Sequence, residues 1–446
     1  MREVSRRRPD FSAVRGSRLV IALSGGADSV ALAVMLAEAR DLDNLTLFAA
    51  HVDHAIRPES AEDALWCREL CARLDIPFHT VRFDVPAEAA RTGEGLETAG
   101  RRLRYDWLRG LKGELGADAI ALAHHMDDQA ETVLMHLARG TGPEGIAGMA
   151  ERSGDLYRPL LSWRKSELTD YLARRGFSWR EDATNAVPDT PRNALRLNVL
   201  PALEDAYPGA VPAIARYARS ARLESDFVAE AAARWLAANH VRGPYGSLLT
   251  SPEKAHPALL RRALRQLCGT DTPWERLNAA ATLAEAGRGR EELSGGWMAE
   301  RGRMGLYLLD RAARPPEPVP LALPGSTALP GVCEITARFV PPVPVRDDPL
   351  RQVLDVDALE GAVLRTRREG DRIRPLGCGE KLLSDYFTDR KLDRPLRDWT
   401  PLLARGRNIL WVCGMGISQS AAIGEGTRRA VALTCCYSYK TQPTDK

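Results

Sequence analysis

Residues 19–29 read Leu19-Val20-Ile21-Ala22-Leu23-Ser24-Gly25-Gly26-Ala27-Asp28-Ser29, an apolar run that leads through two glycines into a helix-like stretch. A strand that enters a helix through glycines can turn tightly and bring several backbone N–H groups close to an anion. The helix N-terminus adds unpaired donors and the positive end of its dipole. Asp28 is either an N-cap acceptor or a ligand of a phosphate-bound metal ion. The junction therefore predicts a site for a phosphate chain, formed by Ser24, Gly25, Gly26, Ala27, Asp28 and Ser29.

Two common phosphate loops are absent from this junction. There is no Gly-x-x-x-x-Gly-Lys-Ser/Thr, and no Gly-x-Gly-x-x-Gly opens the helix. An ordinary serine-capped turn is the structural alternative. The six-residue string resembles the pyrophosphate loop (PP-loop) of the N-type ATP pyrophosphatases. This resemblance implies that ATP is split into AMP and pyrophosphate while an acceptor is activated.

The first part of the chain alternates strand-like and helix-like patterns. Apolar runs near 18–24, 45–52, 78–85 and 118–124 alternate with helical patterns near 29–40, 59–74, 95–114 and 127–139. Such alternation predicts an α/β fold with a doubly wound parallel sheet, which binds ligands at the carboxyl ends of its strands. We expect residues 1–210 to form a Rossmann-like catalytic domain.

The remainder divides by composition into three parts. Helical periodicity from Val211 to about Gly287 predicts a helical domain over 211–311. The proline-rich stretch 312–349 predicts a semi-rigid linker region. Residues 350–446 predict a small mixed α/β domain, and their segment 365–411 is rich enough in Lys and Arg to suggest contact with a nucleic-acid backbone.

Overall composition excludes several classes of protein. The net charge of +3 is too small to indicate a polyanion partner by itself. Eight cysteines without a Cys-x-x-Cys pair favour a reducing cytoplasm. The basic N-terminus lacks the apolar segment of a signal peptide, and no apolar run approaches membrane-spanning length. We expect a cytoplasmic protein that does not enter a membrane.

Unusual polar residues follow two further predicted strands. The second strand leads into His51 and His54, and the fourth leads into a motif that runs from His124 to Thr132. In that motif Asp127, Asp128 and Glu131 stand at a helix start, where carboxylates can hold Mg²⁺ near bound phosphates. The structural alternative is that these acids complement the helix dipole.

The histidines support a rival hypothesis, a metal-dependent hydrolase. Its first ligands would be His51, His54, His124 and His125 together with the nearby carboxylates. That hypothesis leaves the serine-glycine loop unexplained.

On the third predicted helix, Glu97, Arg101, Arg104 and Tyr105 form one stripe, which a surface salt-bridge ladder would also explain. Here the sequence resembles the tRNA(Ile)-lysidine synthetase family, although Gly100 stands where that family usually has alanine. The resemblance covers most of the chain. It is carried by segments 24–29, 51–57, 97–105 and 124–132, by Arg139-Gly140, by Asp182, Asn185, Arg192, Asn193, Arg196 and Leu200-Pro201, and by Arg367, Gly370-Asp371-Arg372, Lys381-Leu382, Phe387, Arg397, Pro401-Leu402-Leu403 and Trp411-Val412.

This resemblance implies a reaction and its partners. ATP would adenylate the 2-oxo group of the wobble cytidine in an isoleucine tRNA with a CAU anticodon. The amine of L-lysine would then displace AMP, which gives lysidine. The cofactors are ATP and Mg²⁺, the partners are tRNA and L-lysine, and a homodimer is possible.

The implied site is divided among the motifs. Residues 24–29 would bind ATP, and Asp128 and Glu131 would hold Mg²⁺ or lysine, with Asp127 and Asp28 beside them. Arg101, Arg104 and Arg192 would face phosphates or the flipped cytidine, and His54 and His125 would handle protons or contact the base.

Two other classes remain open besides the hydrolase. A tRNA-thiolating relative would share the loop but normally carries paired cysteines, whereas Cys67 and Cys71 lie inside a helical pattern. A non-catalytic RNA-binding module would bind tRNA without releasing pyrophosphate.

Overall fold

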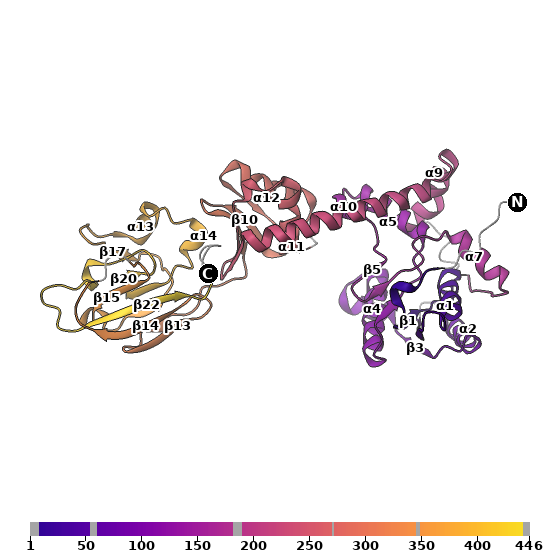
Figure 1. Cartoon of the computed structure of the whole chain (residues 1–446), viewed down its shortest axis with the longest axis horizontal. Coiled ribbons are helices and arrows are strands. Elements are labelled where there is room, and N and C mark those ends of the chain that lie inside the picture. The colour runs from indigo at the N-terminus through magenta and orange to yellow at the C-terminus, as the bar shows by residue number, and fades with distance from the viewer. Residues whose placement is uncertain (1–8, 54–59, 182–189, 270–271, 345–347, 440–446) are drawn as a thin grey trace. The chain divides into compact units, whose positions relative to one another are not determined.

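The computed structural model describes residues 9–53, 60–181, 190–269, 272–344 and 348–439. The chain divides into two compact units, Met1–Ser225 and Asp226–Lys446, which are described in turn (Figure 1). No helix in these described ranges has both the length and the apolarity that crossing a membrane requires.

The first unit is built on a six-stranded sheet with the order β3-β2-β1-β4-β6-β5. Neighbouring strands are parallel, except that β5 is antiparallel to β6. Strand addition changes direction at β1, so the carboxyl ends of β1 and β4 flank the topological switch point. The strands are β1 (Arg18–Ala22), β2 (Thr46–Asp53), β3 (Phe78–Arg82), β4 (Ala119–Ala121), β5 (Arg152–Ser153) and β6 (Leu156–Tyr157).

Helices connect these strands close to the predicted positions, which confirms the doubly wound α/β fold. The short pair β5 and β6 and the helix α3 were not predicted. The helices are α1 (Ala27–Ala39), α2 (Ser60–Arg73), α3 (Val85–Thr92), α4 (Leu96–Glu114), α5 (Met126–Ala138), α6 (Pro143–Ile146), α7 (Lys165–Arg174), α8 (Pro191–Ala194), the π-helical turn η3 (Leu195–Val199), α9 (Leu200–Ala206) and α10 (Ala210–Asn239).

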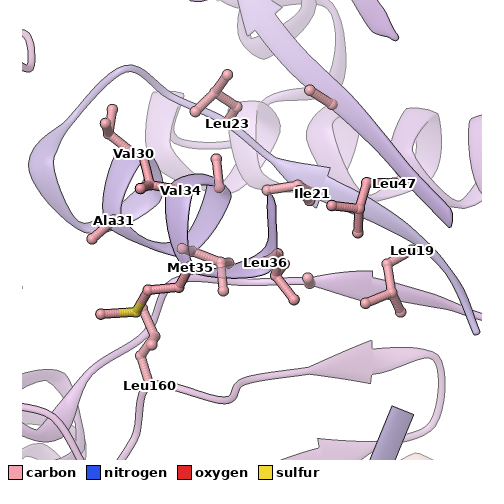
Figure 2. Close-up of a cluster of buried hydrophobic side chains, with 14 of the residues drawn as sticks. Leu19, Ile21, Leu23, Val30, Ala31, Val34, Met35, Leu36, Leu47 and Leu160 are labelled. Carbon is pink, nitrogen blue, oxygen red and sulfur yellow. The ribbon is translucent and has the colours of Figure 1, made fainter. Parts of the chain in front are cut away.

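The sheet is buried on both faces because successive side chains of a strand point to opposite sides. Leu19 and Ile21 of β1 pack with Val34 of α1 on one face, as Figure 2 shows. Val20 packs with Leu108 of α4 on the other face. All five side chains are at most 1% exposed. Each such burial stabilises the fold by about 1.5–3 kcal/mol, and together they hold the loop after β1 in place.

In the second unit, the helices predicted for 211–311 are present, but a five-stranded antiparallel sheet accompanies them. Its order is β7-β8-β11-β10-β9. The strands are short, and the central strand β11 is buried along an unbroken run, so no period of two was visible in the sequence. The elements are the C-terminal part of α10, β7 (His240–Gly243), β8 (Gly246–Thr250), α11 (Pro257–Cys268), α12 (Trp274–Ala286), β9 (Gly289–Glu292), β10 (Trp297–Arg301) and β11 (Gly305–Asp310).

The rest of the second unit is a mixed module of two sheets that share one apolar core, including Ile335, Leu403 and Trp411. One sheet has the order β12-β16-β19-β20-β17-β18, with β21 paired to β20, and the other has the order β13-β14-β22-β15. The elements are β12 (Val319–Pro320), β13 (Gly325–Leu329), β14 (Cys333–Val340), β15 (Arg351–Asp355), β16 (Val363–Arg365), β17 (Arg372–Ile373), β18 (Lys381–Leu382), α13 (Leu383–Asp389), α14 (Arg394–Arg397), β19 (Leu402–Arg405), β20 (Asn408–Val412), β21 (Gly416–Ile417) and β22 (Ala430–Tyr437).

The region 312–349 is therefore not a linker over its whole length. It contributes β12, β13 and β14, and all eight residues of β14 pair with β22. Pro324 and Pro330 stand immediately before and after β13, and Pro341 follows β14. The prolines limit the strands instead of interrupting them, because proline is tolerated at strand ends and edges.

Candidate active site

The loop between β1 and α1 has the geometry expected of an anion site. Gly25 takes φ = +88°, a left-handed conformation that favours glycine. A Cβ atom at Gly25 would also lie only 3.3 Å from Sγ of Cys67. The two loop hydroxyls, of Ser24 and Ser29, lie 3.1 Å apart. Helix α1 starts at Ala27 without a side-chain cap, so its first N–H groups remain available for a ligand.

Asp28 lies in the first turn of α1 and faces the loop after β4. Its Oδ2 atom is 3.5 Å from Nε2 of His125. Its Oδ1 atom is buried and has no hydrogen-bond partner among the described residues. A buried carboxylate oxygen without a partner is costly unless a ligand satisfies it. This oxygen suits a cation that accompanies a phosphate chain.

His125 is the N-cap residue of α5 and lies between three carboxylates. Its ring nitrogens are 3.5 Å from both Asp28 and Asp127 and 3.4 Å from Asp128. Burial lowers the pKa of His125, but hydrogen bonds with Asp127 and Asp28 and the charge of Asp128 outweigh it and raise the pKa to about 10. The Asp128 amide also lies 3.4 Å from Nδ1, no farther than the carboxylates, and this long capping contact is lost when Nδ1 carries a proton. His125 is therefore a fixed cation at neutral pH.

The predicted magnesium pair, Asp128 and Glu131, is joined to two arginines. Nε of Arg192 and Nε of Arg196 donate to Glu131 at 2.8 and 2.6 Å. Both arginines also donate to Oδ1 of Asp128, at 3.2 and 3.0 Å. The Glu131 side chain is completely buried. These guanidinium groups occupy the carboxylate oxygens that a cation would need.

Among the residues that the structure describes, no cluster of three or more His, Cys, Asp or Glu side chains is placed to hold a metal ion. Asp128 and Glu131, as they are folded here, do not fit a magnesium site. The arrangement instead uses them to hold Arg192 and Arg196 beside α5.

A cavity of about 310 Å³ lies next to His125, between α5 and the segments that follow it. Arg164 connects two of its acids, because its Nε donates to Asp127 at 3.1 Å and its Nη1 donates to Glu204 at 3.0 Å. The carboxylate of Glu204 also accepts from the amide of Val211 at 3.0 Å, in the first turn of α10. The lining residues are His125, Asp127, Glu131, Arg164, Lys165, Arg196, Leu200, Pro201, Glu204 and Val211.

This cavity carries acids, bases and an apolar patch side by side. It therefore suits a small zwitterion with an aliphatic chain. The volume is at the small end of the range of roughly 300–1,000 Å³ for small-molecule sites.

A second basic group lies around His124. Arg101 and Arg104 of α4 both lie over the Tyr105 ring, at 4.9 and 5.3 Å from its centroid. Within the described ranges Glu97 forms no ion pair with either arginine, so the predicted stripe is not a salt-bridge ladder. Burial lowers the pKa of His124 to about 4, and nearby arginines oppose its protonation further. A neutral imidazole among cations suits an anionic or hydrogen-bonding ligand.

His51 lies near the carboxyl end of β2. Nδ1 of His51 lies 2.9 Å from the Leu23 carbonyl oxygen, and the ring stacks on Phe78. Burial lowers its pKa. His51 thus links β2 to the end of β1, which is a structural role. His54 lies outside the described residues, as do Asp182 and Asn185.

Comparisons with known proteins agree with this geometry. The sequence profile of the PP-loop domain matches residues 3–203, and that of the TilS substrate C-terminal domain matches residues 362–433. The chain is 33% identical to tRNA(Ile)-lysidine synthase of Parabacteroides distasonis over 93% of this chain and 94% of that protein. The chain belongs to the tRNA(Ile)-lysidine synthase family. A tRNA(Ile)-lysidine synthase of Thermus thermophilus is 38% identical, with 89% of this chain and 69% of that protein covered.

Membership of the tRNA(Ile)-lysidine synthase family makes this chain a PP-loop enzyme that uses ATP. It favours the predicted synthase over the metal hydrolase, the thiolating enzyme and the non-catalytic module. The resemblance found in the sequence is confirmed over most of the chain.

Several residues of the site in this tRNA(Ile)-lysidine synthase family member could not be recognised from its sequence. Arg158 is buried beside the His124 group and directly follows β6, a two-residue strand too short to recognise. Arg164 and Glu204 reach the cavity from α7 and α9, far along the chain from α5. Only a predicted contact between these helices would have revealed them.

Proposed function

We propose that this chain joins L-lysine to carbon 2 of the wobble cytidine in an isoleucine tRNA with a CAU anticodon. The cytidine 2-oxygen first attacks the α-phosphate of ATP, and pyrophosphate leaves. A lysine amine then attacks carbon 2, and AMP departs with the oxygen. The observation that carries this proposal is the contact of Asp28 with His125, which sets the phosphate loop beside a cavity suited to an amino acid.

The loop 24–29 would hold the triphosphate through the first amides of α1 and the two serine hydroxyls. Mg²⁺ would enter as the MgATP complex, and the open Oδ1 of Asp28 is the oxygen best suited to reach it. When bound, the ion would neutralise the leaving pyrophosphate. His125 would act as a fixed positive charge and not as a proton donor, because its pKa of about 10 keeps it protonated.

Lysine would occupy the cavity beside His125. Its carboxylate and its two amines would exchange with the ion pairs that Arg164 forms with Asp127 and Glu204. Its aliphatic stem would lie against the apolar patch, which includes Leu200 and Val211. This placement brings an amine close to the loop on which the adenylate forms.

Arg101, Arg104 and Arg158 would receive the target nucleotide and the phosphates beside it. Guanidinium groups bind phosphate through paired hydrogen bonds and stack on bases. A base must leave its stack to react, and the basic side chains around His124 would hold it there. The cytoplasmic location and the homodimer stay predictions.

The order of the two steps gives a direct test. With ATP and the CAU-anticodon tRNA but no lysine, we expect pyrophosphate release and an adenylated tRNA detectable by mass spectrometry. Pyrophosphate release that requires lysine but not tRNA would contradict the proposal, because it would place activation on the amino acid.

A further inference from the structure

Residues 177–181, which follow α7, form a segment without regular secondary structure that we call the strap. Phe177 and Trp179 of the strap pack against the apolar core that α1 shares with the sheet. Arg180 comes next, and its backbone amide donates to the carbonyl of Gly25 at 2.9 Å. A segment far along the chain therefore contacts the loop 24–29 directly.

The bond from Arg180 fixes the orientation of the peptide that joins Gly25 to Gly26. This peptide is trans, so its C=O and its N–H point in opposite directions. Because the Gly25 carbonyl is held on the side of the strap, the Gly26 N–H is directed to the opposite side of the loop. Backbone amides held in one direction at the start of a helix bind phosphate oxygens. The strap thus sets the direction of one donor of the phosphate loop.

The loop is closely packed around Gly25. A Cβ atom on Gly25 would lie 3.7 Å from Cγ of Arg180 and 3.3 Å from Sγ of Cys67 in α2. The strap and α2 therefore both lie against the loop at this residue. A displacement of the strap would remove one of these two supports together with the hydrogen bond to the Gly25 carbonyl.

The Arg180 side chain ties the strap to α2. Its Nε donates to Oδ1 of Asp63 at 2.7 Å, and its Nη2 lies 3.5 Å from Glu62. The Asp63 side chain is 20% exposed and that of Glu62 is 72% exposed, so solvent screens the Asp63 contact less. A partly exposed ion pair contributes little to overall stability, so placement of the strap explains the pair better.

We propose that Arg180 is a positioning residue for the phosphates of ATP. Its amide orients the Gly25–Gly26 peptide, and its ion pair with Asp63 keeps the strap against the loop. This inference rests on the proposed function only in that the loop 24–29 binds the triphosphate. It adds the parts of the chain that hold this loop in its binding geometry.

The test measures the affinity of the full-length chain for MgATP and for AMP by calorimetry, in the absence of tRNA. Arg180→Gln should raise the Kd for ATP about fivefold, the scale of one partly exposed ion pair. The Kd for AMP should stay close to the parental value, because AMP lacks the two outer phosphates. The matched control is Arg175→Gln, since Arg175 pairs with Glu38 of α1 from the end of α7. It should keep the parental Kd for ATP.

Asp63→Ala separates positioning from charge. Removing an acid makes the surroundings of the loop more positive, so a charge effect alone would tighten ATP binding. Loss of positioning should weaken it instead, again about fivefold. The double variant Arg180→Gln, Asp63→Ala should bind ATP no more weakly than either single variant, because both substitutions break the same link.

Parental ATP affinity in folded Arg180→Gln would overturn the positioning role, and so would parental or tighter binding in folded Asp63→Ala. Equal losses for ATP and AMP would overturn it as well, because they would show a general disturbance of the nucleotide site. Losses that add in the double variant would show that the two residues do not form one link.

If one single variant does not fold, the other decides the role by the same measure. Failure of the proposed function is a separate outcome, in which the parent chain binds ATP but forms no lysidine. Each of these comparisons of ATP with AMP can still be made on such a chain.

Discussion

Nε2 of His125 lies 3.5 Å from Oδ2 of Asp28, so the loop after β1 and the start of α5 meet through a charged contact. The two residues stand at the carboxyl ends of β1 and β4, on either side of the switch point of the sheet. The contact brings the loop 24–29 and the cavity beside His125 into one site. Each prediction below changes one component of that site or of the module that accompanies it.

Asp28→Asn should abolish most pyrophosphate release while leaving the fold intact. Asparagine keeps the size of the side chain but removes its negative charge, so the open Oδ1 loses its attraction for a cation and the charged contact of Oδ2 with His125 is lost. We expect a fall of about 100-fold or more in rate, as for other preorganised charge contacts. The measurement is tRNA-dependent pyrophosphate release. The control Asp75→Asn changes a fully solvated acid, and an equal loss there would contradict the assignment.

His125→Gln should change how stability depends on pH. The pKa of His125 is raised from 6.5 to about 10 in the folded chain, so its stabilisation is complete below pH 6.5 and is lost as pH rises toward 10. The parent should therefore lose Tm over that window more steeply than the variant. His79→Gln is the control, because this half-buried histidine lies on β3 away from the three carboxylates. If Tm falls equally with pH in the parent and in His125→Gln, His125 is not held in its protonated form by the three carboxylates.

Arg164→Gln should raise the KM for lysine without changing the KM for ATP. The side chain joins Asp127 to Glu204 at the wall of the cavity, and a hydrogen bond to a charged group contributes about 1.5–3 kcal/mol. We expect a change of about 10-fold or more in steady-state kinetics. Arg174→Gln, at the exposed end of α7, serves as the control. An increase in both KM values would argue that the substitution disturbs the whole unit instead.

Asp393→Ala should destabilise the second unit and leave nucleotide binding unchanged. Its carboxylate accepts from the amides of Arg303 and Met304 at 2.8 and 2.9 Å and from the Tyr307 hydroxyl at 2.8 Å. Removing the acceptor of these three hydrogen bonds, one of them from the buried Tyr307 hydroxyl, should cost about 2–4 kcal/mol in the free energy of unfolding. Denaturant unfolding measures this cost. Asp389→Ala, which changes an exposed acid, should cost little. Equal losses of unfolding free energy in the two variants would show that the three hydrogen bonds to Asp393 do not stabilise the unit.

The doubly wound sheet and the loop 24–29 could be predicted because local pattern determines both. Apolar runs alternate with helical periods, and the glycines mark the turn directly. The partners of Asp128 and Glu131 could not be predicted, because Arg192 and Arg196 come from a segment about 60 residues later. The sheet of β7–β11 was missed because buried short strands lack a period of two, and the strands within 312–349 were hidden by the prolines that bound them.

The measurement that tests the central claim most directly is ATP-dependent incorporation of labelled L-lysine into tRNA. The full-length chain should label an isoleucine tRNA with a CAU anticodon, release one AMP and one pyrophosphate per lysine, and leave unlabelled a variant whose wobble cytidine is replaced by uridine. Equal labelling of both tRNAs, or labelling without ATP, would contradict the account.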